Sequence, residues 1–217
     1  MTSEPIRDPL KDHLLTPQNS AFIVIDYQPI QVSSIRSMDQ KELVFNIVHT
    51  AKAAVNYSLP IVHSTVNVSN GNNQPPIQPL MDVLKAYPTY DRTTINSWED
   101  TEFKKAVVAT GRKKLVMTAL WTEACLTFPA LDALKEGYEV YVVADAVGGT
   151  SVTAHESALR RMEQAGARII SKTQLYCELQ RDWARQKTVP GFMDVFESWD
   201  GFKPEKGSKD EPSKRRA

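Results

Sequence analysis

The chain has 217 residues, of which 41% are hydrophobic, and its 26 basic residues balance its 26 acidic ones. This length suits one well-buried α/β domain and is too short for two ordinary ones. The charge balance gives no reason to expect nucleic acid or an anionic membrane surface as a partner, so a small molecule is favoured.

The cysteines and the composition of the N-terminal stretch predict the cellular compartment of the protein. Cys125 and Cys177 lie far apart, and the N-terminal stretch has no charged segment followed by an apolar one. We therefore expect free thiols and a soluble, cytoplasmic protein. The longest apolar runs fall far short of the roughly 20 residues that cross a bilayer, so no membrane association is expected.

The first predicted strand ends at an acidic residue. Residues 21–25 form a β-branched apolar run closed by Asp26, which predicts a buried parallel strand with Asp26 at its carboxyl end. Asp39 can cap the helix that follows, because a helix-spaced row of apolar residues begins just after it. Residues 67–90 are rich in Asn, Pro and Gln, and they predict a long irregular excursion that lines a site.

The alternation of strands and helices continues through the second half, where glycines end the helices. Gly111, Gly137 and Gly166 each follow a helical pattern, as is common at helix C-termini. Strands are predicted over residues 21–25, 59–64, 114–120, 138–144 and 168–171. Helices are predicted over residues 40–57, 80–86, 101–110, 126–136, 151–165 and 173–186.

This alternation predicts an α/β fold, a three-layer α/β/α sandwich whose central sheet is mostly parallel and Rossmann-like. A single domain is expected over residues 1–202, followed by a polar tail over residues 203–217 that has no apolar anchor. Asp26, Cys125 and Asp145 each follow a predicted strand, so we expect all three at the carboxyl edge of the sheet, where such folds place their sites.

Cys125 stands where a strand gives way to a helical pattern. A helix N-terminus offers unpaired N–H groups and a partial positive charge, which lower a thiol pKa and can hold an oxyanion. The sequence therefore predicts a nucleophile. The alternative is that Cys125 is a small apolar residue packed beneath a helix, as most free cysteines are.

Six segments of the chain are specific as a set, although each would be weak alone. They are residues 21–28, 92–98, 120–125, 128–134, 137–145 and 161–167. Together they resemble one family, the isochorismatase-like cysteine hydrolases, and within it the YcaC-type branch. The resemblance extends over roughly residues 15–185.

The resemblance implies a catalytic triad of aspartate, lysine and cysteine. Asp26 and Cys125 match it, but Arg92 stands where the lysine is expected, and arginine does not release a proton near neutral pH. We expect Asp26 to act as general base and Arg92 to keep it ionised. The alternative makes Arg92 a surface salt-bridge residue and gives the third position to Asp91 or Lys85.

The resemblance also implies an oxyanion hole, formed by backbone N–H groups of Cys125 and of the neighbourhood of Trp121, with a cis peptide expected between Leu120 and Trp121. Thr122 is expected either to brace this turn or to cap the helix. A substrate pocket is expected from five side chains, although aromatics at strand ends are often simply core. The five are Tyr27, Trp98, Trp121, Thr122 and Phe128.

No metal or cofactor is expected. Metal-dependent relatives that cleave nicotinamide use an aspartate and paired histidines after the second strand, whereas this chain offers only His63 there. His63 is interpreted as a packed or pocket residue. The resemblance further implies a homo-oligomer, in which the apolar segment over residues 189–202 is expected to reach a neighbouring subunit.

A cysteine nucleophile favours hydrolysis of a C–N bond in a small amide-like substrate through a thioester. Two alternatives stay open. One is a catalytically decayed family member that acts as a binding or scaffold protein, which the arginine in place of lysine motivates. The other is a thiol-redox role, which needs Cys177 as the resolving thiol near Cys125.

Overall fold

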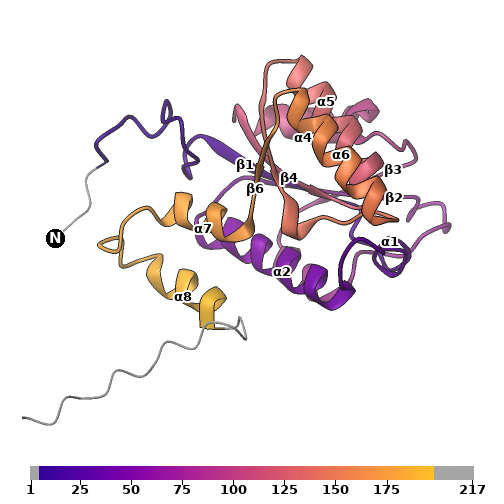
Figure 1. The fold of residues 1–217 in the computed structure, drawn as a ribbon, viewed down its shortest axis with the longest axis horizontal. Coiled ribbons are helices and arrows are strands. Elements are labelled where there is room, and N and C mark those ends of the chain that lie inside the picture. Colours follow the sequence, from indigo (N-terminus) through magenta and orange to yellow (C-terminus); the bar gives the residue numbers. More distant parts are fainter. Residues whose placement is uncertain (1–4, 198–217) are drawn as a thin grey trace, which may run out of the picture.

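The computed structural model describes residues 5–197, so the predicted tail over residues 203–217 lies outside the described part. Six parallel strands form one sheet in the order β3-β2-β1-β4-β5-β6 (Figure 1). The strands are β1 (Ser20–Ile25), β2 (Ile61–Val66), β3 (Thr89–Arg92), β4 (Lys114–Ala119), β5 (Glu139–Val143) and β6 (Arg168–Ile170).

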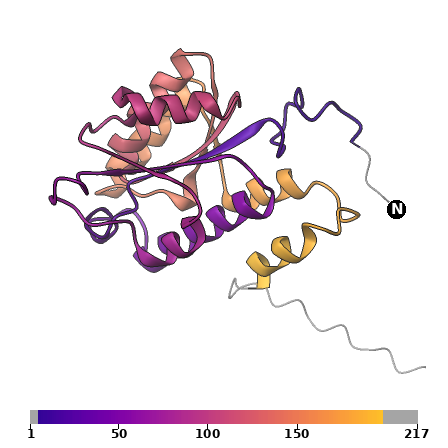
Figure 2. The same cartoon turned by 180° about the vertical axis from the view of Figure 1, so that it is seen from behind.

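Helices cover both faces of the sheet. The α-helices are α1 (Pro29–Ser33), α2 (Gln40–Asn56), α3 (Gln78–Leu84), α4 (Thr101–Ala109), α5 (Thr127–Lys135), α6 (Val152–Gln164), α7 (Lys172–Gln180) and α8 (Val189–Glu197). Figures 1 and 2 show α4, α5 and α6 on one face and α2, α7 and α8 on the other. The predicted three-layer α/β/α sandwich is confirmed.

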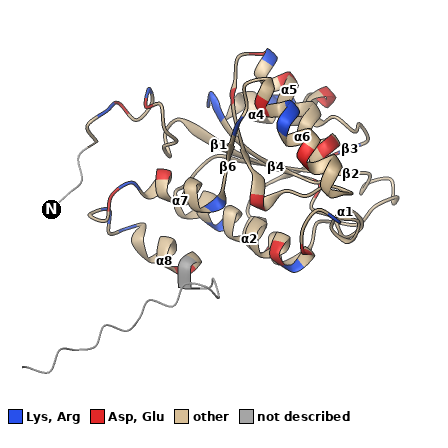
Figure 3. Cartoon of the chain, viewed as in Figure 1, with Lys and Arg blue, Asp and Glu red and all other residues tan. Residues whose placement is uncertain are grey.

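Each face of the sheet has its own hydrophobic core. Along β1, Phe22 and Val24 pack into the core beneath α2, while Ala21, Ile23 and Ile25 pack into the core beneath α4 and α5. All five side chains are fully buried. A strand covered on both faces needs apolar residues at every position, which explains the uninterrupted run in the sequence. Charged residues of both signs lie mainly on the helices and loops around the sheet (Figure 3).

Register brings the ends of the central strands to one level. Ile25, the last residue of β1, pairs with Ala119 at the end of β4 and with Ser64 near the end of β2. On the outer side of β2, Val66 pairs with Arg92, the last residue of β3. The chain therefore leaves four neighbouring strands at the same edge of the sheet.

Strand β3 was not predicted. It has only four residues, pairs with β2 alone, and begins at the end of the Pro-rich excursion, so it carries little of the apolar pattern of a buried strand. This short edge strand nevertheless positions Arg92.

The predicted helix over residues 173–186 is wrong in its second half. Helix α7 ends at Gln180, and Arg181 adopts a left-handed conformation with φ of 59°. The Arg181 guanidinium binds the Asp12 carboxylate at 2.9 Å and the Leu15 carbonyl at 3.0 Å. These contacts with the N-terminal segment end the helix where its local sequence would allow it to continue.

Helix α8 packs on its own chain. Its Phe192 and Val195 are 5% and 4% exposed and belong to the core beneath α2, and Phe192 contacts the rings of Tyr176 and Trp183 edge-on. The expected reach of residues 189–202 to a neighbouring subunit stays a prediction, and residues 198–202 lie outside the described part. Among the described helices, none is long and apolar enough to cross a membrane.

Replacing Phe192 with alanine should lower the free energy of unfolding by about 3 kcal/mol, because it opens a cavity between α2, α7 and α8. Urea-induced unfolding followed by circular dichroism measures this loss. The matched control is Val152→Ala on α6, whose side chain is 51% exposed and should change stability little. Equal small effects for both variants would contradict the packing of α8.

Candidate active site

Asp26 and Arg92 form a buried, two-pronged ion pair beyond the carboxyl ends of β1 and β3. The two guanidinium nitrogens Nη1 and Nη2 of Arg92 lie 2.7 Å from Oδ1 and 2.7 Å from Oδ2 of Asp26, and both side chains are fully buried. Asp26 leaves β1 in a left-handed conformation, with φ of 62°. Such a conformation is uncommon for aspartate and turns the chain sharply where the carboxylate meets the guanidinium.

Other groups fix the guanidinium in place. Its Nη1 also donates to the Ser64 hydroxyl at 3.1 Å and to the Thr65 carbonyl at 3.0 Å, while Nη2 donates to the Ile95 carbonyl at 3.2 Å. Burial lowers the pKa of Arg92, but the hydrogen bonds and charge of Asp26 outweigh it, so the pKa lies above its ordinary value. Arg92 therefore stays charged and serves as the counter-ion of Asp26.

The alternatives for the third position receive no support. Asp91 accepts hydrogen bonds from the Thr65 hydroxyl and from the backbone of Val68 and Ser69, so its carboxylate shapes the loop after β2. Lys85 is exposed at the end of α3. Arg92 is accordingly no surface salt-bridge residue.

Cys125 lies in a short π-helical turn, η2 (Thr122–Leu126), between β4 and α5. The peptide bond between Leu120 and Trp121 is cis. The Cys125 side chain is buried, at 8% exposure. Burial raises the pKa of its thiol to about 12, assisted by the charge of Asp26 and a hydrogen bond with it, whereas the charge of Arg92 and a hydrogen bond from the backbone of Trp121 act in the opposite direction.

The expectation of a lowered thiol pKa is therefore wrong for the resting protein. The sulfur lies inside the turn, removed from water and facing a carboxylate, and these two effects outweigh the nearby positive charge. The thiol is protonated at neutral pH, and the charge of the nearby Asp26 carboxylate favours that protonated form.

Trp121 directly precedes the η2 turn and Thr122 is its first residue, and the side chains of both are fixed by hydrogen bonds. The Trp121 indole N–H donates to the Ser34 hydroxyl at 2.6 Å. The Thr122 hydroxyl lies 2.9 Å from Nδ1 of His155 on α6 and makes no capping bond to the turn. Of the two interpretations of Thr122, the structure supports the brace.

The remaining predicted pocket residues do not meet in one wall. Tyr27 is fully buried in the core beneath α2, and its hydroxyl donates to the Ala146 carbonyl at 2.6 Å. Trp98 lies in the other core, which it shares with Cys125, and its indole N–H donates to Glu136 at 3.0 Å. Phe128, in the first turn of α5, is 36% exposed.

Asp145 follows β5 at the carboxyl edge of the sheet, as expected. Its carboxylate accepts a 2.7 Å hydrogen bond from the backbone N–H of Lys172, so it binds the start of α7. Ser64 was not predicted as a site residue, although its place at the end of the second predicted strand was a usable signal. His155 was not predicted as a site residue either, because it belongs to no local motif.

His63 is fully buried in β2, and burial lowers its pKa to about 4, so its ring is neutral at pH 7. Its Nδ1 lies 3.4 Å from the Thr89 hydroxyl. Residues 5–197 contain no cluster of three or more His, Cys, Asp or Glu side chains able to hold a metal ion.

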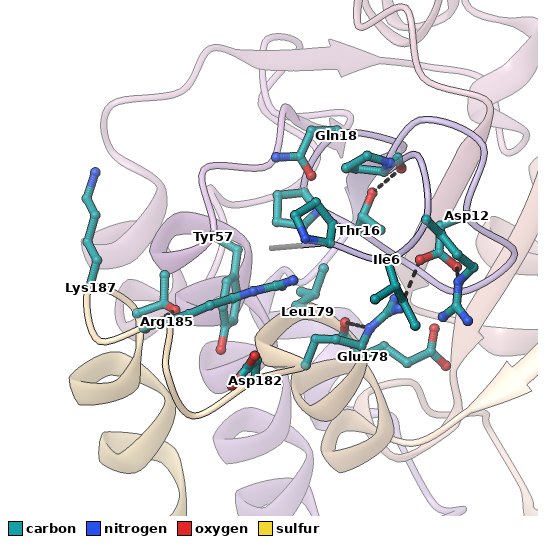
Figure 4. Close-up of a pocket in the computed structure, with 16 residues that line it drawn as sticks. Ile6, Asp12, Thr16, Gln18, Tyr57, Glu178, Leu179, Asp182, Arg185 and Lys187 are labelled. Carbon is teal, nitrogen blue, oxygen red and sulfur yellow. Dashed lines mark hydrogen bonds and ion pairs between the residues drawn. The ribbon is translucent and has the colours of Figure 1, made fainter. Parts of the chain in front are cut away.

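A separate cavity of about 510 Å³ lies at the opposite edge of the sheet, between the N-terminal segment and the connection from α7 to α8 (Figure 4). Asp12 at its wall binds both Arg7 and Arg181, so the principal charges there neutralise one another. The cavity borders Thr16 to Gln18, which precede β1, and is therefore remote from the carboxyl edge that holds Cys125.

The family of the chain follows from comparison with known proteins. Residues 20–174 match the model of the isochorismatase domain. The chain belongs to the isochorismatase family of hydrolases. It is 33% identical over 183 residues to the probable hydrolase YcaC of Escherichia coli, covering 84% of this chain and 86% of that protein, which confirms the YcaC-type resemblance.

Solved structures agree with this assignment. YcaC from Pseudomonas aeruginosa, with hexane-2,5-diol and covalent acrylamide, superposes with a TM-score of 0.80 at 32% identity, covering 85% of this chain and 90% of that one. Escherichia coli YcaC, described as an octameric hydrolase of unknown specificity, gives a TM-score of 0.76 at 30% identity, covering 92% and 99%.

Replacing Arg92 with methionine should destabilise the protein by about 3 to 5 kcal/mol, because the Asp26 carboxylate is left buried without a counter-ion. Lysine at this position restores the charge and should recover most of that loss. Urea-induced unfolding of Arg92→Met and Arg92→Lys measures both values. Indistinguishable stabilities for the two variants would show that the charge of Arg92 is not what the pair requires.

The thiol of Cys125 should stay protonated up to pH 10, because its pKa lies near 12. Asp26→Asn removes the negative charge that favours the protonated thiol, so the thiolate should appear at a lower pH. Absorbance at 240 nm in a Cys177→Ser background follows the titration, with Cys125→Ser as the blank. A higher midpoint in Asp26→Asn would contradict the contact between the two groups.

Proposed function

We propose that this chain is a cysteine-dependent hydrolase that cleaves a C–N bond of a small amide-like substrate through a thioester intermediate. The observation that carries the proposal is a buried thiol near enough to the Asp26 carboxylate for its charge to raise the thiol pKa, with that carboxylate bound on both oxygens by a guanidinium. Nucleophile, base and orienting group thus form one connected chain, as nucleophilic catalysis requires.

In the first half-reaction, Asp26 takes the thiol proton as the sulfur of Cys125 bonds to the carbonyl carbon, which becomes a tetrahedral oxyanion. Collapse of the oxyanion breaks the C–N bond. The proton passes from Asp26 to the leaving nitrogen, which departs as ammonia or an amine. A thioester on Cys125 remains.

In the second half-reaction, water adds to the thioester carbon while Asp26 accepts one of its protons. The C–S bond then breaks, the sulfur recovers the proton, and a carboxylic acid leaves. Both half-reactions use the same carboxylate as base and then as acid, so one proton carrier is sufficient.

Arg92 contributes charge rather than a proton in this scheme. Its pKa is raised above an already high value, so it remains a cation throughout. It holds the carboxylate in one orientation and opposes the negative charge that develops on the sulfur. An arginine is therefore compatible with a mechanism in which Asp26 alone moves protons.

The oxyanion is assigned to the backbone N–H groups of Trp121 and Cys125. Support comes from the Trp121 backbone, which lies near enough to the sulfur to lower the pKa of the thiol. Trp121, half-buried, and Phe128, exposed, are proposed to contact the substrate, with Thr122 holding the turn beneath it. Tyr27 and Trp98 support this region from the two cores.

The relatives add two further points. The covalent acrylamide of the Pseudomonas aeruginosa relative is a small amide, which favours small amide-like ligands for this chain. The octamer of the Escherichia coli relative favours a homo-oligomer here as well. We also propose a cytoplasmic location, since both cysteines are free and one of them, Cys177, is exposed.

The second candidate is a binding or scaffold protein that has lost the chemistry. The arginine in place of the family's lysine motivates it, because a site under weaker selection tolerates such a change. A redox role has less support, because Cys125 is buried with a raised thiol pKa, opposite to a redox-sensing cysteine.

Incubation of the protein with a panel of small amides, followed by intact-protein mass spectrometry and an ammonia-release assay, should reveal an acyl adduct on Cys125 and steady product formation. Cys125→Ser should abolish both. Asp26→Asn should reduce turnover by about 100-fold or more, because it removes the proposed general base. Cys177→Ser is the matched control and should behave as the parent protein does.

Absence of both adduct and product from the folded parent protein across the panel would favour the decayed-enzyme alternative. Turnover that survives Cys125→Ser would instead refute the covalent route while leaving hydrolysis in place.

A further inference from the structure

The turn that carries Cys125 is attached to α6 and to the loop before it by a set of side-chain bonds that the mechanism above does not use. Thr122 and Glu123 are the first two residues of the turn. The Thr122 side chain contacts His155 on α6, and the Glu123 side chain accepts a hydrogen bond from Thr150 in the loop. Helix α6 lies beside α5 on the same face of the sheet (Figure 1). No residue of α6 belongs to the catalytic triad.

Every polar group of Thr122 is occupied. Its N–H donates to the Gly148 carbonyl at 2.9 Å, its carbonyl accepts from the Thr127 hydroxyl at 2.6 Å, and its hydroxyl lies 2.9 Å from Nδ1 of His155. The Thr122 side chain is fully buried, so an unbound hydroxyl would cost free energy there. His155 thus fixes the side chain next to Trp121.

Glu123 makes a second attachment. Its Oε1 accepts from the backbone N–H of Thr150 at 3.0 Å and from the Thr150 hydroxyl at 2.6 Å. Its Oε2 is buried without a hydrogen-bond partner and approaches Gly149 closely, since a Cβ atom there would lie 2.7 Å from it and 2.9 Å from Cβ of His155. Only glycine allows the carboxylate and helix α6 to come this near.

The loop is itself anchored on the opposite side. The N–H of Gly149 donates to the Ser37 hydroxyl at 2.9 Å, and its carbonyl accepts from the N–H of Arg36 at 3.0 Å. The loop therefore connects the segment between α1 and α2 with the cysteine turn. A displacement of the turn would have to break contacts with two separate parts of the chain.

We propose that His155 is a positioning residue for the hydrolase reaction, which through Thr122 holds the η2 turn so that the Cys125 sulfur stays against Asp26. The expected effect on turnover rests on the proposed function, whereas the position of the turn can be tested without a substrate. Burial lowers the pKa of His155, against the charges of Glu123 and Glu156, so the ring is neutral at pH 7 and keeps one nitrogen as an acceptor. His155 does not touch the reacting atoms.

The experiment compares His155→Phe, which removes the bond to Thr122, with His155→Asn, which retains a polar group near Nδ1. Both are made in the Cys177→Ser background, and Thr153→Ala, an exposed position in the same helical turn, is the matched control. His155→Phe should lower kcat about tenfold or more with a smaller change in KM, because the turn is misplaced and ligand contacts persist. His155→Asn should recover most of the loss.

The second readout needs no substrate. When the turn loosens, the sulfur leaves Asp26 and gains water, so the pKa of Cys125 should fall from its raised value towards about 8.5. Absorbance at 240 nm should then show a thiolate below pH 10 in His155→Phe and in Thr122→Val, but not in His155→Asn, Thr122→Ser or Thr153→Ala. Thermal unfolding measures the stability of each variant. A loss of stability alone would not shift the titration in His155→Phe and Thr122→Val while leaving the other variants unshifted.

The two outcomes separate this inference from the proposed function. A shifted titration in His155→Phe and Thr122→Val supports the positioning role even when the parent protein hydrolyses no amide. An unshifted titration in folded His155→Phe and Thr122→Val overturns it, whatever the activity of the parent protein.

Discussion

The buried ion pair between Asp26 and Arg92 is the interaction on which the arrangement of the carboxyl edge of the sheet depends. Removing two charges from water costs several kcal/mol for each ion, and their attraction offsets that cost only when geometry and further hydrogen bonds are good. Here both carboxylate oxygens lie 2.7 Å from guanidinium nitrogens, and Ser64, Thr65 and Ile95 accept from the same nitrogens. The ends of β1, β2 and β3 are thereby fixed relative to one another.

This pair also decides how the cysteine can act. A thiol that faced the cation would tend to ionise in the resting protein, whereas burial and the charge of Asp26 keep the Cys125 thiol protonated. In the proposed reaction, activation therefore requires proton transfer within the site at the moment of attack. An arginine suits the proposed reaction, because Arg92 supplies a permanent positive charge while Asp26 carries the proton.

The contacts at the two edges of the sheet hold different segments of the chain together. At the carboxyl edge, the turn that carries Cys125 is held by α6 and by the loop before it, so helices that do not contribute a reacting group still determine where the sulfur lies. At the amino edge, Asp12 joins Arg7 and Arg181 and ties the N-terminal segment to the end of α7. Each edge thus joins separate segments of the chain through its own set of contacts.

The sequence alone determined the layered fold, the strand-end position of Asp26 and the place of Cys125 after β4, because apolar periodicity and glycine placement are local signals. Only the tertiary structure decided the sign of the thiol pKa shift, the existence of β3 and the role of His155. Each of these depends on charges, burial or edge pairing between segments far apart in the chain. A local pattern records which residues end a strand, but the environment that the rest of the chain builds around them sets their chemistry.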